Sequence, residues 1–213
     1  MTADHIASVY GEAETEYIIK KSRFLVHLKE VTTEAEVNAF LEGLRKQYWD
    51  ASHNCYAYQL GLGGRIQKSS DDGEPSGTAG RPMLEVLKKN EITNTVAVIT
   101  RYFGGVKLGA SGLIRAYSHG VSLGLETAKI ADYLPYTIYT LSFDYSFVST
   151  LERLIPAQEA QITERTFTDK VAFNCQVPEE KGTSFLEAIT NATNGRALYE
   201  DLGTKVLPII RAK

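Results

Sequence analysis

A glycine-rich turn flanked by cations spans residues 101–112, which read RYFGGVKLGASG. It joins an apolar strand to the start of a helix, where exposed backbone N–H groups and nearby cations favour an anion such as phosphate. Arg115 and His119 follow four residues apart, on one face of that helix. We predict a binding site for RNA or phosphate that comprises Arg101, Tyr102, Phe103, Gly104, Gly105, Lys107, Ser111, Arg115 and His119. The alternative is a tight turn whose glycines only let strand and helix approach each other.

A second candidate segment, the loop 69–80, reads SSDDGEPSGTAG and holds three carboxylates in four residues. Such a group could bind a divalent cation or serve as acid and base. The spacing differs from the alternating ligands of an EF-hand loop, and Asp-Gly and Pro-Ser pairs are typical of surface turns. We predict a contact loop without a metal ion, made of Asp71, Asp72, Glu74 and Arg81.

His53 and Cys55 lie two positions apart, which suggests a catalytic pair, but the sequence shows no third group to orient them. We therefore predict that Cys55 is a core residue and that His53 forms hydrogen bonds at a strand edge. Tyr48 and Trp49, at the end of the first helix, are predicted to belong to the core.

Alternating and helical hydrophobic patterns predict the elements that position these residues. In the first part, strands are expected at 23–29, 54–62 and 94–102, the first with one wet face and the last buried on both faces. A helix should begin after a capping box formed by Thr33 and Glu36, and a second should cover 112–129.

The second part reads strand, helix, two strands, helix, strand, with Pro178 at the first turn of the second helix. This βαββαβ order in about 75 residues is typical of ferredoxin-like domains. Twelve of the 17 glycines fall between Gly61 and Gly124, so the composition changes before Pro135. We predict two domains, 1–134 and 135–213, in an α+β protein.

Composition excludes several classes of protein. The 213 residues are 43% hydrophobic and 23% charged, as is usual for globular chains. The net charge of −3 gives no general attraction to nucleic acid, so any anion-binding surface must be local. No apolar run approaches the roughly 20 residues of a membrane span, and no signal peptide is evident. The two cysteines form no predicted disulfide, and we expect a cytoplasmic protein without a membrane partner or a DNA-binding motif.

Taken together, the motifs resemble those of the IMPACT/YigZ family. The matching residues are Ser22-Arg23-Phe24, Ala51 with His53-Asn54-Cys55, Asp71-Asp72-Gly73-Glu74-Pro75 through Arg81-Pro82, and Thr100-Arg101-Tyr102-Phe103-Gly104-Gly105 through Arg115-Ala116-Tyr117. The resemblance covers about residues 17–130, and the remainder is similar to the smaller domain that follows in bacterial members.

The resemblance implies an N-terminal ribosomal-protein βαβ fold, similar to domain IV of elongation factor G, and a ferredoxin-like domain similar to its domain V. Eukaryotic relatives regulate translation by competing for the co-activator of an amino-acid-starvation kinase, partly through an additional N-terminal domain. For bacterial members the family supplies no settled biochemical function.

Two functions remain open at this stage. The first is a non-enzymatic regulator associated with translation, which binds RNA, the ribosome or a translation factor through the cationic glycine-rich turn and needs no cofactor. The second is an enzyme that binds phosphate or a nucleotide at the same turn and holds a metal on the Asp-Asp-Gly-Glu loop. Because the turn lacks the Gly-Lys-Ser/Thr ending of a phosphate-binding P-loop and no base–nucleophile pair is evident, the sequence favours binding over catalysis.

Overall fold

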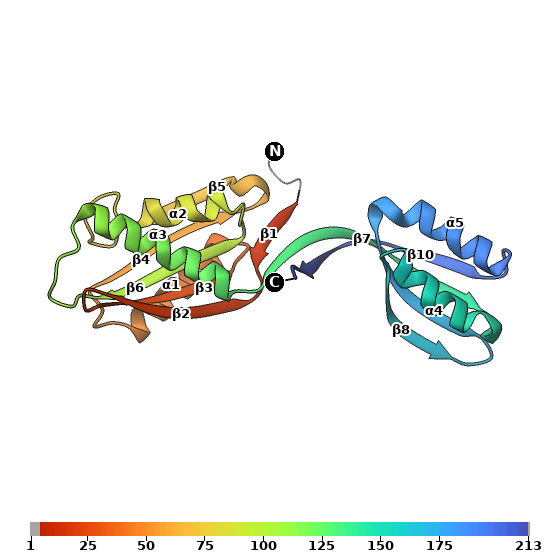
Figure 1. The fold of residues 1–213 in the computed structure, drawn as a ribbon. Coiled ribbons are helices and arrows are strands. Elements are labelled where there is room, and N and C mark those ends of the chain that lie inside the picture. The colour runs from red at the N-terminus through yellow and green to blue at the C-terminus, as the bar shows by residue number, and fades with distance from the viewer. Residues whose placement is uncertain (1–4, 213) are drawn as a thin grey trace. The chain divides into compact units, whose positions relative to one another are not determined.

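The computed structural model describes residues 5–212 and divides into two compact units (Figure 1). Leu134–Leu207 form the second unit, and the other described residues form the first. We predicted a single division after residue 134. The structure instead returns the chain to the first unit from Pro208 onward. The strands explain this return: β7 (Ile130–Phe143) begins in the first unit, contains Pro135, and pairs with β10 (Leu198–Ile210). The backbone N–H of Arg211 still donates to the Ile130 carbonyl, at 2.8 Å.

The first unit is built on a five-stranded sheet in which every neighbouring pair is antiparallel. Its strands, in spatial order, are β2 (Glu12–Ile19), β3 (Ser22–Glu30), β6 (Thr95–Tyr102), β4 (His53–Leu60) and β5 (Ile66–Ser70). A short strand, β1 (Ile6–Val9), pairs with the first residues of β7. Because β6 lies between β3 and β4, the ends of three strands meet at the edge where β6 finishes.

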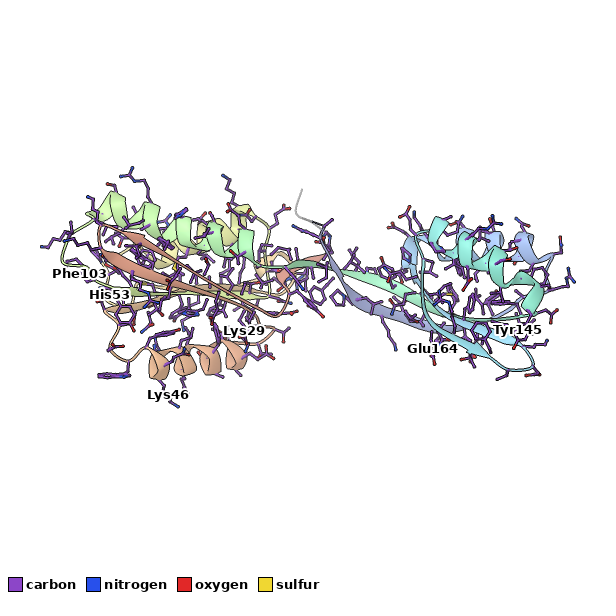
Figure 2. All side chains as sticks on the ribbon, turned by 60° about the horizontal axis from the view of Figure 1, so that its bottom comes forward. Lys29, Lys46, His53, Phe103, Tyr145 and Glu164 are labelled. Atoms are coloured by element: carbon purple, nitrogen blue, oxygen red, sulfur yellow. The ribbon has the colours of Figure 1, made fainter. Side chains whose placement is uncertain are left out.

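Helices cover both faces of this sheet. The helices α2 (Gly80–Lys89) and α3 (Ala110–Thr127) lie on one face, where Met83 and Tyr117 pack against Phe24, Cys55 and Ile99 (Figure 1). The helix α1 (Glu34–Gln47) covers the other face (Figure 2). There its buried stripe of Val37, Leu41 and Leu44 packs against Tyr58, Val96 and Val98. The burial of β6 on both faces, which its apolar sequence predicted, is confirmed.

Three local predictions met different outcomes. The capping box at the start of α1 is confirmed, since Thr33 Oγ1 accepts from the Glu36 N–H and the Glu36 carboxylate accepts from the Thr33 N–H, each at 3.2 Å. The prediction of a wet face on β3 was wrong, because Leu25 and His27 on that face are buried. The assignment of Trp49 to the core was also wrong: its side chain is 82% exposed, two residues beyond the end of α1 at Gln47.

The second unit has the predicted βαββαβ order. It runs through β7, α4 (Val148–Ala157), β8 (Gln161–Phe167), β9 (Val171–Pro178), α5 (Gly182–Thr193) and β10. The strand order β10-β7-β9-β8 places the first and third strands of the unit, β7 and β9, between the other two, as in ferredoxin-like domains. We predicted that Pro178 lies in the first turn of α5, but Pro178 ends β9. A 3-10 turn at Glu179–Lys181 then precedes the helix. The α+β class is confirmed. Within residues 5–212, no helix is long and apolar enough to cross a membrane.

Two helical glycines respond oppositely to the same substitution. A Cβ atom at Gly43 in α1 would meet nothing within 4 Å, so Gly43→Ala should raise the free energy of unfolding by about 0.5–1 kcal/mol through helix propensity. At Gly120 in α3 it would lie 2.6 Å from Tyr17 Oη and 2.7 Å from Ile99 Cδ1, so Gly120→Ala should lower that free energy by about 1–3 kcal/mol. Urea denaturation followed by circular dichroism measures both, and equal effects would contradict the packing of α3 on the sheet.

Candidate functional site

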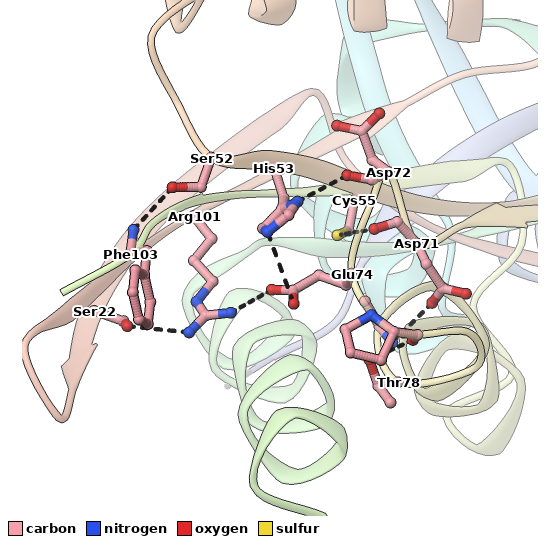
Figure 3. Close-up of polar contacts among 12 residues, drawn as sticks. Ser22, Ser52, His53, Cys55, Asp71, Asp72, Glu74, Thr78, Arg101 and Phe103 are labelled. Atoms are coloured by element: carbon pink, nitrogen blue, oxygen red, sulfur yellow. Dashed lines mark hydrogen bonds and ion pairs between the residues drawn. The ribbon is translucent and has the colours of Figure 1, made fainter. Parts of the chain in front are cut away.

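A buried ion pair lies at the end of β6. The Arg101 Nη1 atom donates to Glu74 Oε1 at 2.5 Å, and the two side chains are only 5% and 3% exposed (Figure 3). Arg101 Nη2 also donates to Ser22 Oγ at 3.2 Å, and the guanidinium lies over the rings of Phe24 and Phe103. Glu74 comes from the loop before α2, so this pair ties together three segments that are distant in the sequence. Arg101 is therefore an internal, positioning cation rather than an exposed one.

Glu74 has two further neighbours. The Tyr117 hydroxyl of α3 donates to Glu74 Oε1 at 2.8 Å, and His53 Nε2 lies 3.8 Å from Glu74 Oε2. The His53 Nδ1–H donates to the Asp72 carbonyl at 2.9 Å, in agreement with its predicted role as a hydrogen-bonding residue (Figure 3). The predicted burial of Cys55 is confirmed; its thiol donates to the Asp71 carbonyl at 2.9 Å, and burial raises its pKa to about 12. A thiol that stays protonated is not a nucleophile.

The three carboxylates of the predicted contact loop have three separate partners. Asp71 accepts from the N–H groups of Gly77, Ala79 and Gly80 at 2.7–2.9 Å and so caps the start of α2. Asp72 accepts from the Asn54 N–H at 2.6 Å, whereas Glu74 binds Arg101. Among the described residues no group of three or more His, Cys, Asp or Glu side chains is placed to hold a metal ion. The loop thus positions the sheet end and α2, while Arg81 is exposed in the first turn of α2.

The glycine turn is held in place by close backbone contacts. A Cβ atom at Gly104 would overlap the carbonyl group of Lys21, so only glycine allows this approach. The Gly104 N–H donates to Ser22 Oγ at 3.2 Å, and the Phe103 N–H donates to Ser52 Oγ at 3.0 Å. Although both of these amides are held, the side chain of Phe103 is 48% exposed. Phe103 and His53 lie at the same end of the first unit (Figure 2).

The close approach of Gly104 brings two lysines to the turn that sequence reasoning missed. Lys20 and Lys21 form the two-residue connection between β2 and β3, with φ of 45° and 65°. Both φ values are those of a type I′ hairpin, which normally takes Asn-Gly and costs non-glycine residues about 1–2 kcal/mol each. Lys20, Lys21 and Lys107 are exposed, and none forms an ion pair with a residue of the described range 5–212. The sequence signal that could have revealed this hairpin is the Lys20-Lys21 pair, which directly follows an alternating, strand-like pattern.

The structure separates the other predicted site residues by exposure. Ser111, Arg115 and His119 are exposed on α3, and Arg115 Nε donates to the Ser111 carbonyl at 3.3 Å. Ser111 does not cap the helix: Gly109 is the N-cap residue, and no side chain bonds to the first amides of α3. Tyr102 is half-buried and donates its hydroxyl to Asp50 Oδ1 at 2.9 Å. Gly105 adopts a φ of 81°, which the turn requires.

Comparison with known proteins places this arrangement in a family. The Impact N-terminal domain matches residues 20–125, and the Domain of unknown function (DUF1949) matches residues 141–196. The chain belongs to the IMPACT family. It is 46% identical over 190 residues to the IMPACT family member YvyE of Bacillus subtilis, which covers 89% of this chain and 88% of that protein. It is 34% identical over 179 residues to YigZ of Escherichia coli, which covers 83% of this chain and 88% of YigZ.

Other IMPACT family members match a shorter part of the chain. The protein IMPACT homolog of Dictyostelium discoideum is 40% identical over 122 residues, which are 55% of this chain but 33% of that protein. Among solved structures, a crystal structure of a hypothetical protein is 30% identical, with a TM-score of 0.60 over 92% of this chain and 96% of that chain.

The buried ion pair allows a direct test of its role in stability. Arg101→Met leaves the Glu74 carboxylate buried without its cation, so the free energy of unfolding should fall by about 3–5 kcal/mol. The double variant Arg101→Met/Glu74→Leu should recover much of this loss. Arg45→Met is the matched control, because the Arg45 side chain is 48% exposed and its Nη2 lies 3.9 Å from Asp72 Oδ1; its effect should stay below about 1 kcal/mol. Equal losses in the two single variants, measured by urea denaturation, would contradict the role assigned to Arg101.

The cap formed by Asp71 predicts a dependence of stability on pH. Partial burial acts to raise the pKa of Asp71, but the backbone N–H groups of Gly77, Ala79 and Gly80 outweigh it and hold the pKa below its usual value. The contribution of Asp71 should therefore be complete above the unfolded-state pKa of about 3.9 and should be lost as the pH falls through the lower folded-state pKa. The difference in unfolding free energy between the wild type and Asp71→Asn, measured from pH 7 to pH 2, should shrink at the acid end. A constant difference would refute the cap.

Proposed function

We propose that this protein regulates translation by binding RNA, presented by the ribosome or by an RNA-bound translation factor, at the glycine turn of the first unit. Three exposed lysines without ion-pair partners in the described chain carry the proposal: Lys20, Lys21 and Lys107. In a protein with a net charge of −3, exposed lysines on the glycine turn and on the hairpin packed against it supply a local attraction to phosphate that the whole surface lacks. Membership of the IMPACT family supports the link to translation and, with it, a cytoplasmic location.

The geometry supports a binding surface built in two layers. The buried pair of Arg101 and Glu74 fixes the end of β6, and the amides of Phe103 and Gly104 are tied to Ser52 and Ser22. Outside this frame lie the lysines, the exposed ring of Phe103 and, on α3, Arg115 and His119. Backbone rigidity keeps the cations and the stacking ring together, which lowers the entropy cost of ordering them around RNA. In this proposal Arg101 positions the turn from inside the fold, and the lysines make the contacts with phosphate.

The enzymatic alternative has less support in this geometry. A metal on the contact loop would need carboxylates free to converge, whereas Asp71, Asp72 and Glu74 each bind a different protein partner. His53 and Cys55 do not form a nucleophile–base pair, because the thiol bonds to the Asp71 carbonyl and the imidazole to the Asp72 carbonyl. We therefore favour binding over catalysis.

Co-sedimentation with ribosomes and their subunits over a salt series tests the proposal. Each lost phosphate contact should reduce the slope of log affinity against log salt by about 0.7–0.9, so the triple variant Lys20→Asn/Lys21→Asn/Lys107→Gln should lower it by about 2. Asparagine is chosen at the hairpin because it tolerates a positive φ. Lys89→Gln, at the far end of α2, is the matched control and should bind as the wild type does. Binding that is insensitive to salt, or unchanged in the triple variant, would overturn the proposal.

A further inference from the structure

The phenyl ring of Phe103 is an exposed aromatic surface on a rigid support. Its side chain is 48% exposed, whereas the backbone N–H groups of Phe103 and Gly104 both donate to serine hydroxyls. The Arg101 guanidinium lies against this ring, with its Cζ atom 5.5 Å from the ring centroid. The same guanidinium lies 5.3 Å from the ring of Phe24 and donates to Glu74, which fix it in place (Figure 3). The ring of Phe103 is therefore backed by an immobile cation while half of the side chain meets solvent.

The exposed lysines lie on the segments next to this ring. Gly104, which directly follows Phe103, approaches the Lys21 backbone so closely that a Cβ atom would overlap its carbonyl group. Lys20 belongs to the same hairpin as Lys21, and Lys107 lies three residues beyond Gly104 on the glycine turn. Cations that hold a phosphate backbone beside a ring that stacks on bases are the combination found in proteins that bind single strands.

The charges at this turn favour an anionic partner. Of the carboxylates that bond to residues of the turn, Glu74 is buried against Arg101, and Asp50 accepts from the Tyr102 hydroxyl at 2.9 Å. The three lysines, which form no ion pair within residues 5–212, outnumber Asp50. A strand of RNA therefore fits the surface better than an acidic face of a protein, which offers no base to stack on the ring.

Phosphate contacts and the exposed ring predict opposite preferences between single-stranded and double-stranded RNA. A duplex has the higher charge density, and each contact gives a salt slope of about 0.9 against about 0.7 for a single strand, so lysines alone favour the duplex. The bases of a duplex are stacked on one another, and the deep, narrow major groove of the A-form excludes side chains. A base reaches the ring of Phe103 only where it is unpaired.

We propose that this surface binds single-stranded RNA and that one unpaired base stacks on the ring of Phe103. This inference rests on the proposed function and names the class of RNA that the glycine turn takes. The lysines supply the attraction to phosphate, which is the same for every sequence. The ring supplies the selection against duplexes, and it accepts any base, because every base has a π face.

The test compares a labelled single-stranded RNA of mixed sequence with the blunt duplex that it forms with its complement. Fluorescence anisotropy at one salt concentration should show the single strand bound about tenfold more tightly, as expected from the stacking of one base. Because phosphate contacts alone act in the other direction, the sign of the difference decides. Equal binding, or tighter binding of the duplex, would overturn the inference.

Variants of Phe103 separate stacking from a structural role as the cover of Arg101. Phe103→Leu keeps an apolar side chain over the guanidinium but has no ring, so it should weaken single-strand binding about tenfold and leave duplex binding unchanged. Phe103→Tyr keeps the ring and should bind as the wild type does. Ile114→Ala is the matched control, because Ile114 is an exposed apolar residue of α3 (41%) without a ring. Wild-type affinity in Phe103→Leu would refute the stacking.

A second measurement needs no variant, in case Phe103→Leu fails to fold in urea denaturation controls. The emission of 2-aminopurine falls when this base analogue stacks, so a single strand that contains it should lose fluorescence when the wild-type protein binds. Emission that stays constant while anisotropy reports binding would overturn the placement of a base on the ring.

The failures of the two proposals are distinguishable. Salt-sensitive binding of single strand and duplex alike, lost in the triple lysine variant, would leave the proposed function intact and refute the stacking. Co-sedimentation with ribosomes by a protein that binds neither free RNA would also refute only the single-strand inference. Absence of binding to RNA and to ribosomes at every salt concentration would refute both.

Discussion

The buried ion pair between Arg101 and Glu74 is the constraint on which the candidate site depends. A charge at the end of a central strand is costly to bury unless an opposite charge and further hydrogen bonds meet it. Glu74 and Ser22 supply these groups for Arg101, Tyr117 donates in turn to Glu74, and each of the three comes from a different segment. The pair therefore brings the loop before α2, the β2–β3 hairpin and α3 to one end of the sheet. Without it, the glycine turn would have no fixed frame.

The glycine turn then converts this internal frame into a surface. Because Gly104 has no side chain, the backbone of the turn can pack directly on Lys21, which places a strained hairpin with two lysines against the turn that carries Lys107. A hairpin that accepts two lysines at positive φ, where asparagine and glycine are favoured, carries a stability cost. Such costs concentrate at functional sites, and here the strained residues are the exposed cations themselves. Strain and charge thus coincide at the surface we propose for RNA.

The two faces of the sheet have different roles in this scheme. On the α2 and α3 side, Arg101, Glu74 and Tyr117 bond to one another, and the carboxylates of the contact loop serve as caps and counter-ions. On the α1 side, the helix ends before it reaches the edge of β3, which leaves Trp49 exposed and a groove beside His27. The first face supplies rigidity, whereas the second exposes the aromatic ring of Trp49.

The sequence by itself determined the elements with strong local signals. The capping box at Thr33, the doubly buried run of β6 and the βαββαβ order of the second unit follow from short-range patterns, as does the family through the string around Arg101. The strands β1, β2 and β5 and the helix α2 were not expected; the first amides of α2 bond to Asp71, which lies several residues before the helix and gives no capping signal in the local pattern. Only the tertiary structure decided that Arg101 is buried, that Trp49 is exposed and that Lys20 and Lys21 join the site. The physical reason is that burial and charge pairing are set by segments far apart in the chain, on which local spacing carries no information.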